Sequence, residues 1–197
     1  MLRVRGLGGL HKALLSLTTS AIDASDLLRA QIVLGVSALD YYVHELTLLG
    51  MLEVYNGARS PTSAFSKFRV SMDSVWGSGA STGTSAWFEN EVREQHGYLS
   101  FQQPDRIADA VRLFSDAKLW QEASSKLNMS EADVKEQLRL IVDRRNKIAH
   151  EADTDPSYPG ARWPISEPDV DNALGFIERV CEAVHSTVVD AKGGMCK

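Results

Sequence analysis

The chain has 197 residues, 44% of them hydrophobic and 24% charged, which is the composition of an ordinary globular protein and not of a disordered or fibrous one. A formal net charge of -5 at pH 7 excludes a protein that coats nucleic acid through a general basic surface, so any contact with RNA must be local. The length fits one domain, and we expect a single domain over residues 1–197.

The cysteines and the first residues narrow the class of protein further. Cys181 and Cys196 are too few for a disulfide framework or a paired CxxC metal site. The N-terminal segment is basic and rich in leucine, but His11 and Lys12 interrupt the apolar run that a signal peptide needs. No run of about 18 uncharged apolar residues is present, which argues against a membrane span. We therefore expect a cytoplasmic protein with no membrane partner, no metal and no cofactor.

The first half of the chain predicts one long helix followed by loops. Apolar residues recur at three- and four-residue steps over 25–55, which predicts an amphipathic helix with a break near Gly50. A turn and a short helix over 64–75 come next. Residues 77–85 are small and polar without periodicity, and they predict a flexible Gly/Ser loop. This loop lacks the lysine of a P-loop, so we do not assign a nucleotide site to it.

The second half predicts further helices. They are expected over 86–95, 104–115 and 130–151, and a last one begins after Ser166. The sequences SEAD and SEPD place a serine cap before acidic residues at the start of the last two. A proline-rich loop, 151–166, lies between them. Because strand-like alternation is scarce, the fold class is all-α, a bundle of about four or five helices.

An arginine interrupts the apolar stripe of the helix expected over 130–151. At steps of three and four residues the stripe consists of Val134, Leu138, Ile141, Arg145, Ile148 and Ala152. An unpaired guanidinium on an apolar face would cost several kcal/mol unless the site is wet or partnered. Asn146 and His150 are four residues apart on a neighbouring face, so three polar groups can converge at one edge of the stripe.

Two structural interpretations compete with a functional one. Cations in the last turn of a helix interact favourably with its negative end, which accounts for Arg144 and Lys147. Arg145 could instead form a buried ion pair with a carboxylate from another helix or a second copy of the chain. From the spacing alone these interpretations come ahead of catalysis, because an arginine followed five residues later by a histidine is common by chance.

A family resemblance changes that weighting. The run RNKIAH matches the Arg-x4-6-His motif of HEPN domains (higher eukaryotes and prokaryotes nucleotide-binding). Three longer segments, the last of which contains the motif, also resemble HEPN sequences: ALDYYVHELTLLGMLEVYNG, FQQPDRIADAVRLF and IVDRRNKIAHEADTDPSYPGARWPIS. From about residue 27 to 189 the chain resembles the RiboL-PSP-HEPN group. The resemblance implies a four-to-five-helix bundle, dimers that bring two motifs together, and metal-independent endoribonuclease activity. Relatives commonly serve as toxins or in defence against phage, and some bind nucleotides or RNA without cutting.

The motif residues suit cleavage of RNA through its own 2′-OH. Histidine can accept or donate a proton near neutral pH, and arginine offers a permanently charged fork of donors to a phosphate. We therefore assign His150 as general base or acid, Arg145 as the ligand of the scissile phosphate and its transition state, and Asn146 as the group that orients them. A symmetric dimer would supply a second His150 and line a shared cleft with Arg145.

Other residues are assigned supporting parts. Arg144, Lys147 and Glu151 flank the motif and are taken as supporting residues. Asp40 and His44 lie one turn apart on the first long helix. They predict a local hydrogen-bonded pair, with a bond to the motif helix as the second interpretation.

The proline-rich loop carries three residues that could touch RNA. Tyr158 and Trp163 could stack on unpaired bases, and Arg162 could contact a phosphate. The competing interpretation is that the aromatic residues pin the loop to the core, with Trp163 as the anchor.

Two functions follow as expectations. The first is a metal-independent endoribonuclease acting as a homodimer on RNA, a toxin or anti-phage effector restrained by an antitoxin or a sensor protein. The alternative is a non-catalytic helical dimer that binds RNA, a nucleotide or a partner protein as an adaptor. The complete set of Arg145, Asn146 and His150 favours the first, because an adaptor does not require the histidine.

Overall fold

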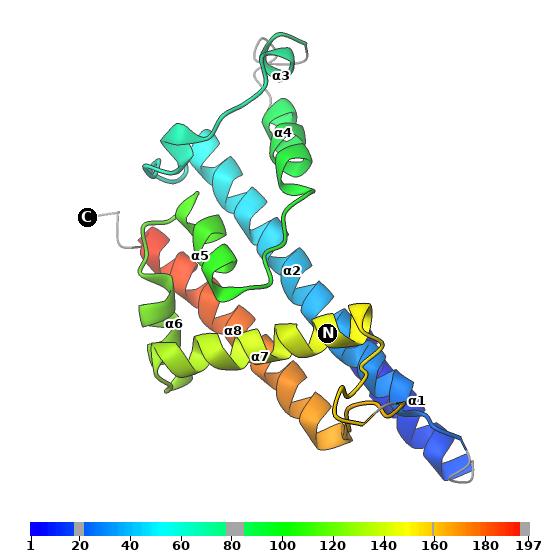
Figure 1. Cartoon of the computed structure of the whole chain (residues 1–197). Helices are drawn as coiled ribbons and strands as arrows, with labels where there is room; N and C mark the ends of the chain where they lie inside the picture. The colour runs from blue at the N-terminus through cyan, green and yellow to red at the C-terminus, as the bar shows by residue number, and fades with distance from the viewer. Residues whose placement is uncertain (18–21, 78–84, 159, 194–197) are drawn as a thin grey trace.

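The computed structural model describes residues 1–17, 22–77, 85–158 and 160–193 (Figure 1). These residues form eight α-helices, one 3-10 helix and no strand beyond an isolated bridge between Thr154 and Arg162, which confirms the all-α class. The helices are more numerous than the expected four or five. Their bounds are α1 Leu2–Leu17, α2 Ser25–Tyr55, η1 Phe65–Lys67, α3 Met72–Gly77, α4 Ala86–His96, α5 Pro104–Arg112, α6 Leu119–Leu127, α7 Glu131–His150 and α8 Glu167–Gly193.

Helix α2 is the central helix of the bundle. It runs without a break from Ser25 to Tyr55, and α1, α4, α5, α7 and α8 pack against it (Figure 1). The expected break at Gly50 is absent, and this glycine is buried within the helix. A Cβ at this position would lie 2.2 Å from the ring of Phe114. The glycine therefore allows close packing and does not bend the helix.

The apolar character of α2 fits this central position. By length and composition alone α2 could cross a membrane, with a mean hydropathy of 1.3 over 18 residues. A helix of such composition is equally typical of a protein core. Its buried polar groups are bonded within the bundle: Gln31 Nε2 donates to the Val4 carbonyl at 3.1 Å, and Arg29 pairs with Asp153. These contacts are those of a core helix.

Both predicted serine caps are present. Ser130 Oγ accepts a hydrogen bond from the Asp133 N–H at 3.1 Å and begins α7, as SEAD predicted. Ser166 Oγ accepts from the Asp169 N–H at 3.4 Å at the start of α8. These bonds satisfy N–H groups that have no partner inside the helix. Helix α7 then crosses the bundle over α2 and α8 in Figure 1, and its last turns reach the N-terminal half of α2.

The helix predicted over 64–75 is wrong as one element. It divides into η1 and α3, because Phe68 is extended, with φ -63° and ψ 129°. The Phe68 ring instead meets Phe88 of α4 at 6.1 Å, and the Ser71 N–H bonds to Glu91 at 3.0 Å. Contacts with α4 thus override local helix propensity.

Two helices of the structure were not predicted, and one predicted loop cannot be compared with the structure. Helices α1 and α6 fall where no helix was expected. In α6 the buried Trp120 donates to the Pro104 carbonyl at 2.9 Å, a long-range contact that the local pattern does not reveal. Residues 78–84, which make up most of the predicted Gly/Ser loop, lie outside the described residues.

The packing at Gly50 gives a prediction for stability. Gly50→Ala is expected to lower the free energy of unfolding by about 1–3 kcal/mol, since its methyl group must displace the Phe114 ring. Gly175→Ala in α8 is the matched control, because nothing lies within 4 Å of its added Cβ. Alanine there should be neutral or stabilise by about 0.5–1 kcal/mol. Urea denaturation of both variants measures the difference, and equal effects would contradict the packing at Phe114 as the cause.

Candidate active site at the end of helix α7

The predicted catalytic residues lie in the last two turns of α7. Arg145 continues the buried stripe of Leu138 and Ile141 and is itself half-buried. Asn146 is also half-buried, while His150, the last residue of the helix, is exposed. The site therefore has an inner end at Arg145 and an outer end at His150.

Arg145 is a cation that has no counter-charge among the described residues. Its Nη1 donates to Asn146 Oδ1 at 3.0 Å, while its Nε is buried and has no hydrogen-bond partner. Among the described residues no carboxylate pairs with Arg145, so the buried ion pair within the chain is not formed. A partly buried guanidinium with an unsatisfied donor is costly unless something else neutralises it, and an anion is the group that would do so.

The His150 imidazole faces outward. In the described part of the chain it has no hydrogen-bond or ion-pair partner, so Arg145 and Asn146 are brought together and His150 is not bonded to either. The helix ends at His150, and the N–H of the next residue, Glu151, donates to the Lys147 carbonyl at 3.0 Å. The histidine is thus free to contact a ligand from outside.

The chain reverses immediately after His150. Ala152 and Asp153 both adopt left-handed backbone conformations, with φ of 51° and 57°. The Asp153 N–H donates a hydrogen bond to the Lys147 carbonyl, one turn back in the helix, at 3.0 Å. This conformation costs a residue with a Cβ about 1–2 kcal/mol, so other contacts must hold the turn in place.

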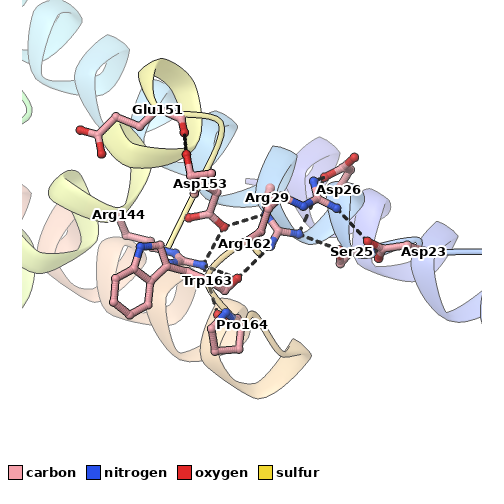
Figure 2. Close-up of polar contacts among 11 residues, drawn as sticks. Asp23, Ser25, Asp26, Arg29, Arg144, Glu151, Asp153, Arg162, Trp163 and Pro164 are labelled. Carbon is pink, nitrogen blue, oxygen red and sulfur yellow. Dashed lines mark hydrogen bonds and ion pairs between the residues drawn. The ribbon is translucent and has the colours of Figure 1, made fainter. Parts of the chain in front are cut away.

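The Asp153 carboxylate supplies the main contact, and Figure 2 shows it between two arginines. Its Oδ2 accepts from Arg29 Nε at 2.7 Å and from Arg144 Nη2 at 2.8 Å. Asp153 is fully buried, and its Oδ1 has no partner among the described atoms. Sequence reasoning missed this residue, because an aspartate three residues after a helix end carries no signal of the arginine on α2.

The helix-end interpretation does not describe Arg144. Its guanidinium also donates to the carbonyls of Trp163 at 3.3 Å and Pro164 at 3.1 Å. Burial lowers the pKa of Arg144 below its ordinary value. Arg144 therefore joins α7 to the loop before α8 through its Nη2, which donates to all three of these acceptors.

Lys147 and Glu151 lie on the outside of the turn. The Lys147 ammonium is 5.2 Å from the centre of the Trp163 ring, a cation–π contact. Glu151 is exposed, and Figure 2 shows its carboxylate pointing away from Asp153. In the described structure no carboxylate neutralises Lys147, as none neutralises Arg145.

The loop residues proposed to touch RNA have different surroundings. Arg162 is paired with Asp23, at 2.7 Å, and with Asp26 (Figure 2). Hydrogen bonds from Ser25, followed by the contact with Arg162, lower the pKa of Asp23 to about 2. The backbone N–H of Trp163 donates to the Asp153 carbonyl at 2.8 Å, and its ring is half-buried. Tyr158 is 68% exposed.

Asp40 and His44 hold another part of the chain. Asp40 accepts from the Phe101 N–H at 2.6 Å and from Gln102 Nε2 at 3.2 Å. The His44 ring packs on Phe101 with centres 4.5 Å apart, and its Nε2 is 3.9 Å from Asp40 Oδ1, too far for a hydrogen bond. In the described structure both residues thus fix the segment before α5, and no bond joins them to α7.

Among the hollows on the described surface, two bear on where the site lies. One, of about 510 Å³, lies between α2 and the end of α7 and is mostly apolar. It is lined by Asp26, Arg29, Ala30, Val33, Leu34, Ile148, Ala152 and Arg162. The other, of about 530 Å³, lies beside α5 and contains His96, whose pKa burial lowers to about 4. We place the candidate site at α7, because Arg145 there keeps a buried donor without a partner among the described atoms.

The chemistry available at α7 is that of an anion site with one titratable group. Within the described ranges no cluster of three His, Cys, Asp or Glu residues is placed to hold a metal ion. The site offers a guanidinium, an amide and an exposed imidazole on an all-helical frame. Such a set can bind a phosphate and transfer a proton.

Comparison with known protein families agrees with this class. The family model described as RiboL-PSP-HEPN matches residues 9–190. The chain therefore belongs to the RiboL-PSP-HEPN family, which confirms the resemblance seen in the sequence. Membership indicates a nucleotide-binding or RNase-type domain, and HEPN domains bind RNA and often act as dimers. Comparisons with curated proteins and with solved structures found no match.

Proposed function

We propose that this protein is a metal-independent endoribonuclease that leaves a 2′,3′-cyclic phosphate and a 5′-OH. The observation that carries the proposal is Arg145. Within the described ranges its half-buried guanidinium hydrogen-bonds only to a neutral amide and keeps one buried donor unsatisfied. The negative charge of a scissile phosphate offsets both deficits and is held where His150 can exchange a proton with the 2′-OH or the leaving oxygen.

The proposal includes a homodimer with the motif at its interface. Supporting it, Leu34 and Tyr41 are 45% and 67% exposed and lie seven residues apart on one face of α2. Leu34 also lines the apolar hollow that ends at Ile148 of α7. A second copy that covers this face buries the apolar surface and brings a second His150 to the same cleft. One imidazole then removes the 2′-OH proton, and the other protonates the 5′ oxygen.

The biological setting that we propose is that of a toxin or anti-phage effector in the cytoplasm. An antitoxin or a sensor protein restrains it. A protein with a net charge of -5 attracts RNA only through local cations. Arg145 and Lys147 supply such cations beside His150.

The activity is tested with purified protein and mixed cellular RNA, incubated with and without EDTA. Cleavage is expected in both reactions, with 3′ ends that resist ligation until the cyclic phosphate is removed to leave a 3′-OH, and 5′ ends that a kinase labels directly. A DNA strand of the same sequence should stay intact, because it lacks the 2′-OH. Cleavage that stops with EDTA, or that yields 5′-phosphate ends, would contradict the proposal.

The adaptor function remains the second candidate, favoured by the absence of a hydrogen bond that orients His150 in the described structure. An adaptor would bind RNA through Arg145 and Lys147 and leave it uncut. Binding without cleavage in the same assay would identify it.

A further inference from the structure

Asp153, Arg29 and Arg144, here called the Asp153 cluster, join three segments directly behind the motif (Figure 2). Arg29 comes from α2, Arg144 from α7 and Asp153 from the turn between α7 and α8. We propose that the Asp153 cluster is a positioning device for His150, an inference that rests on the proposed ribonuclease function. Asp153 touches no substrate in this proposal and acts through the turn.

His150 and Asp153 are close together along the chain. Only Glu151 and Ala152 separate them, and the Lys147 carbonyl accepts the N–H groups of both Glu151 and Asp153 at 3.0 Å. The histidine lies inside this closed loop of hydrogen bonds. A displacement of Asp153 therefore moves His150, and about 1 Å at a catalytic group can cost about 100-fold in rate.

The Asp153 cluster also fixes the far end of the loop before α8. The Asp153 carbonyl accepts from the Trp163 N–H at 2.8 Å. The Trp163 carbonyl in turn accepts from Arg29 at 2.9 Å and from Arg144 at 3.3 Å. Both ends of the loop thus meet the same two guanidinium groups, so the turn cannot shift without breaking several charge-assisted bonds.

The charges of the cluster depend on Asp153. One buried carboxylate faces two guanidinium groups, so its negative charge holds both arginines in place. Neutralising Asp153 removes the carboxylate that both arginines share and leaves Arg29 only the more distant and exposed Asp26, at 3.8 Å, so the two cations should separate. Arg144 and Arg145 are neighbours in the chain but have different roles. Arg144 holds the turn through its bond to Asp153, whereas Arg145 keeps one buried donor without a partner among the described atoms.

Asp153→Asn is the direct test, with Glu91→Gln as its matched control. Glu91 is a buried carboxylate of α4 that also accepts several bonds, among them one from the Gln95 amide at 2.6 Å, and α4 lies away from α7 in Figure 1. For each variant we would measure single-turnover cleavage, the half-saturating RNA concentration and amide hydrogen exchange over residues 147–163. All rates are expressed per folded molecule.

Asp153→Asn is expected to lower the single-turnover rate about 10- to 100-fold, to leave the half-saturating RNA concentration unchanged, and to speed hydrogen exchange over 147–163. Glu91→Gln should change neither the rate nor that exchange. Because the Asn variant could fail to fold, Arg144→Gln is the second variant. It keeps the Arg29–Asp153 pair and should give a smaller loss of rate with the same pattern.

Full cleavage by folded Asp153→Asn, or unchanged hydrogen exchange in that variant, overturns the positioning role while the ribonuclease proposal stands. An equal loss in Glu91→Gln also overturns it, because the effect would then be general. An unaltered protein that cleaves no RNA at all overturns the proposed function and this inference with it. Cleavage by the unaltered protein therefore distinguishes failure of the positioning role from failure of the proposed function.

Discussion

His150→Ala is expected to reduce the single-turnover rate of RNA cleavage by about 100- to 10,000-fold, the range that general acid-base catalysis supplies. The imidazole is exposed and has no partner in the described structure, so its removal should change the free energy of unfolding by less than about 0.5 kcal/mol. RNA binding should persist, because Arg145 and Lys147 remain. A labelled RNA in excess protein measures the rate, and a binding titration measures affinity.

The control for this variant is His185→Ala. His185 is also exposed on a helix, α8, and lies outside the motif. Its replacement should leave cleavage unchanged. Cleavage by His150→Ala at the rate of the unaltered protein would remove the histidine from the mechanism and favour the adaptor. Sedimentation of both variants shows whether the oligomeric state is unchanged.

Arg145→Leu is expected to slow cleavage strongly while making the fold more stable. The rate should fall by about 100- to 1,000-fold, as when a donor to a developing oxyanion is lost. The leucine continues the apolar stripe and removes a buried Nε that has no partner. Since an unsatisfied buried donor costs about 1–3 kcal/mol, the free energy of unfolding should rise, by about 1 kcal/mol after the lost bond to Asn146 is counted.

Urea denaturation and the cleavage assay test the two halves of this prediction separately. Arg112→Ala is the control, an exposed arginine paired with Asp109 on α5, and it should affect neither measurement strongly. Arg145→Leu that unfolds more easily and still cuts RNA would make Arg145 a structural residue. That result would support the ion-pair interpretation, with the counter-charge supplied by another copy of the chain.

Arg145 and its neighbour Arg144 illustrate how much the sequence alone could predict. The stripe count placed Arg145 on the buried face, and the structure has it there, half-buried and bonded to its neighbour Asn146. The same reasoning gave Arg144 a helix-end explanation, which the structure corrects. Its partner, Asp153, becomes available only because the turn after α7 brings the aspartate back beneath the helix.

Local interactions explain what the sequence determined by itself. The all-α class, α2, and the caps at Ser130 and Ser166 depend on periodicity and on hydrogen bonds within three residues. All the residues that produce these patterns lie within a few helical turns of one another in the sequence. The motif at the end of α7, and with it the family, was readable for the same reason.

Only the tertiary structure decided the contacts between distant segments. Phe68 is extended because it meets Phe88, and Arg162 is neutralised because the start of α2 brings Asp23 and Asp26 to it. The Asp153 cluster likewise joins residues more than one hundred positions apart, Arg29 and Asp153. No local pattern encodes such pairs, because their free energy depends on burial and charge that exist only once the helices have packed.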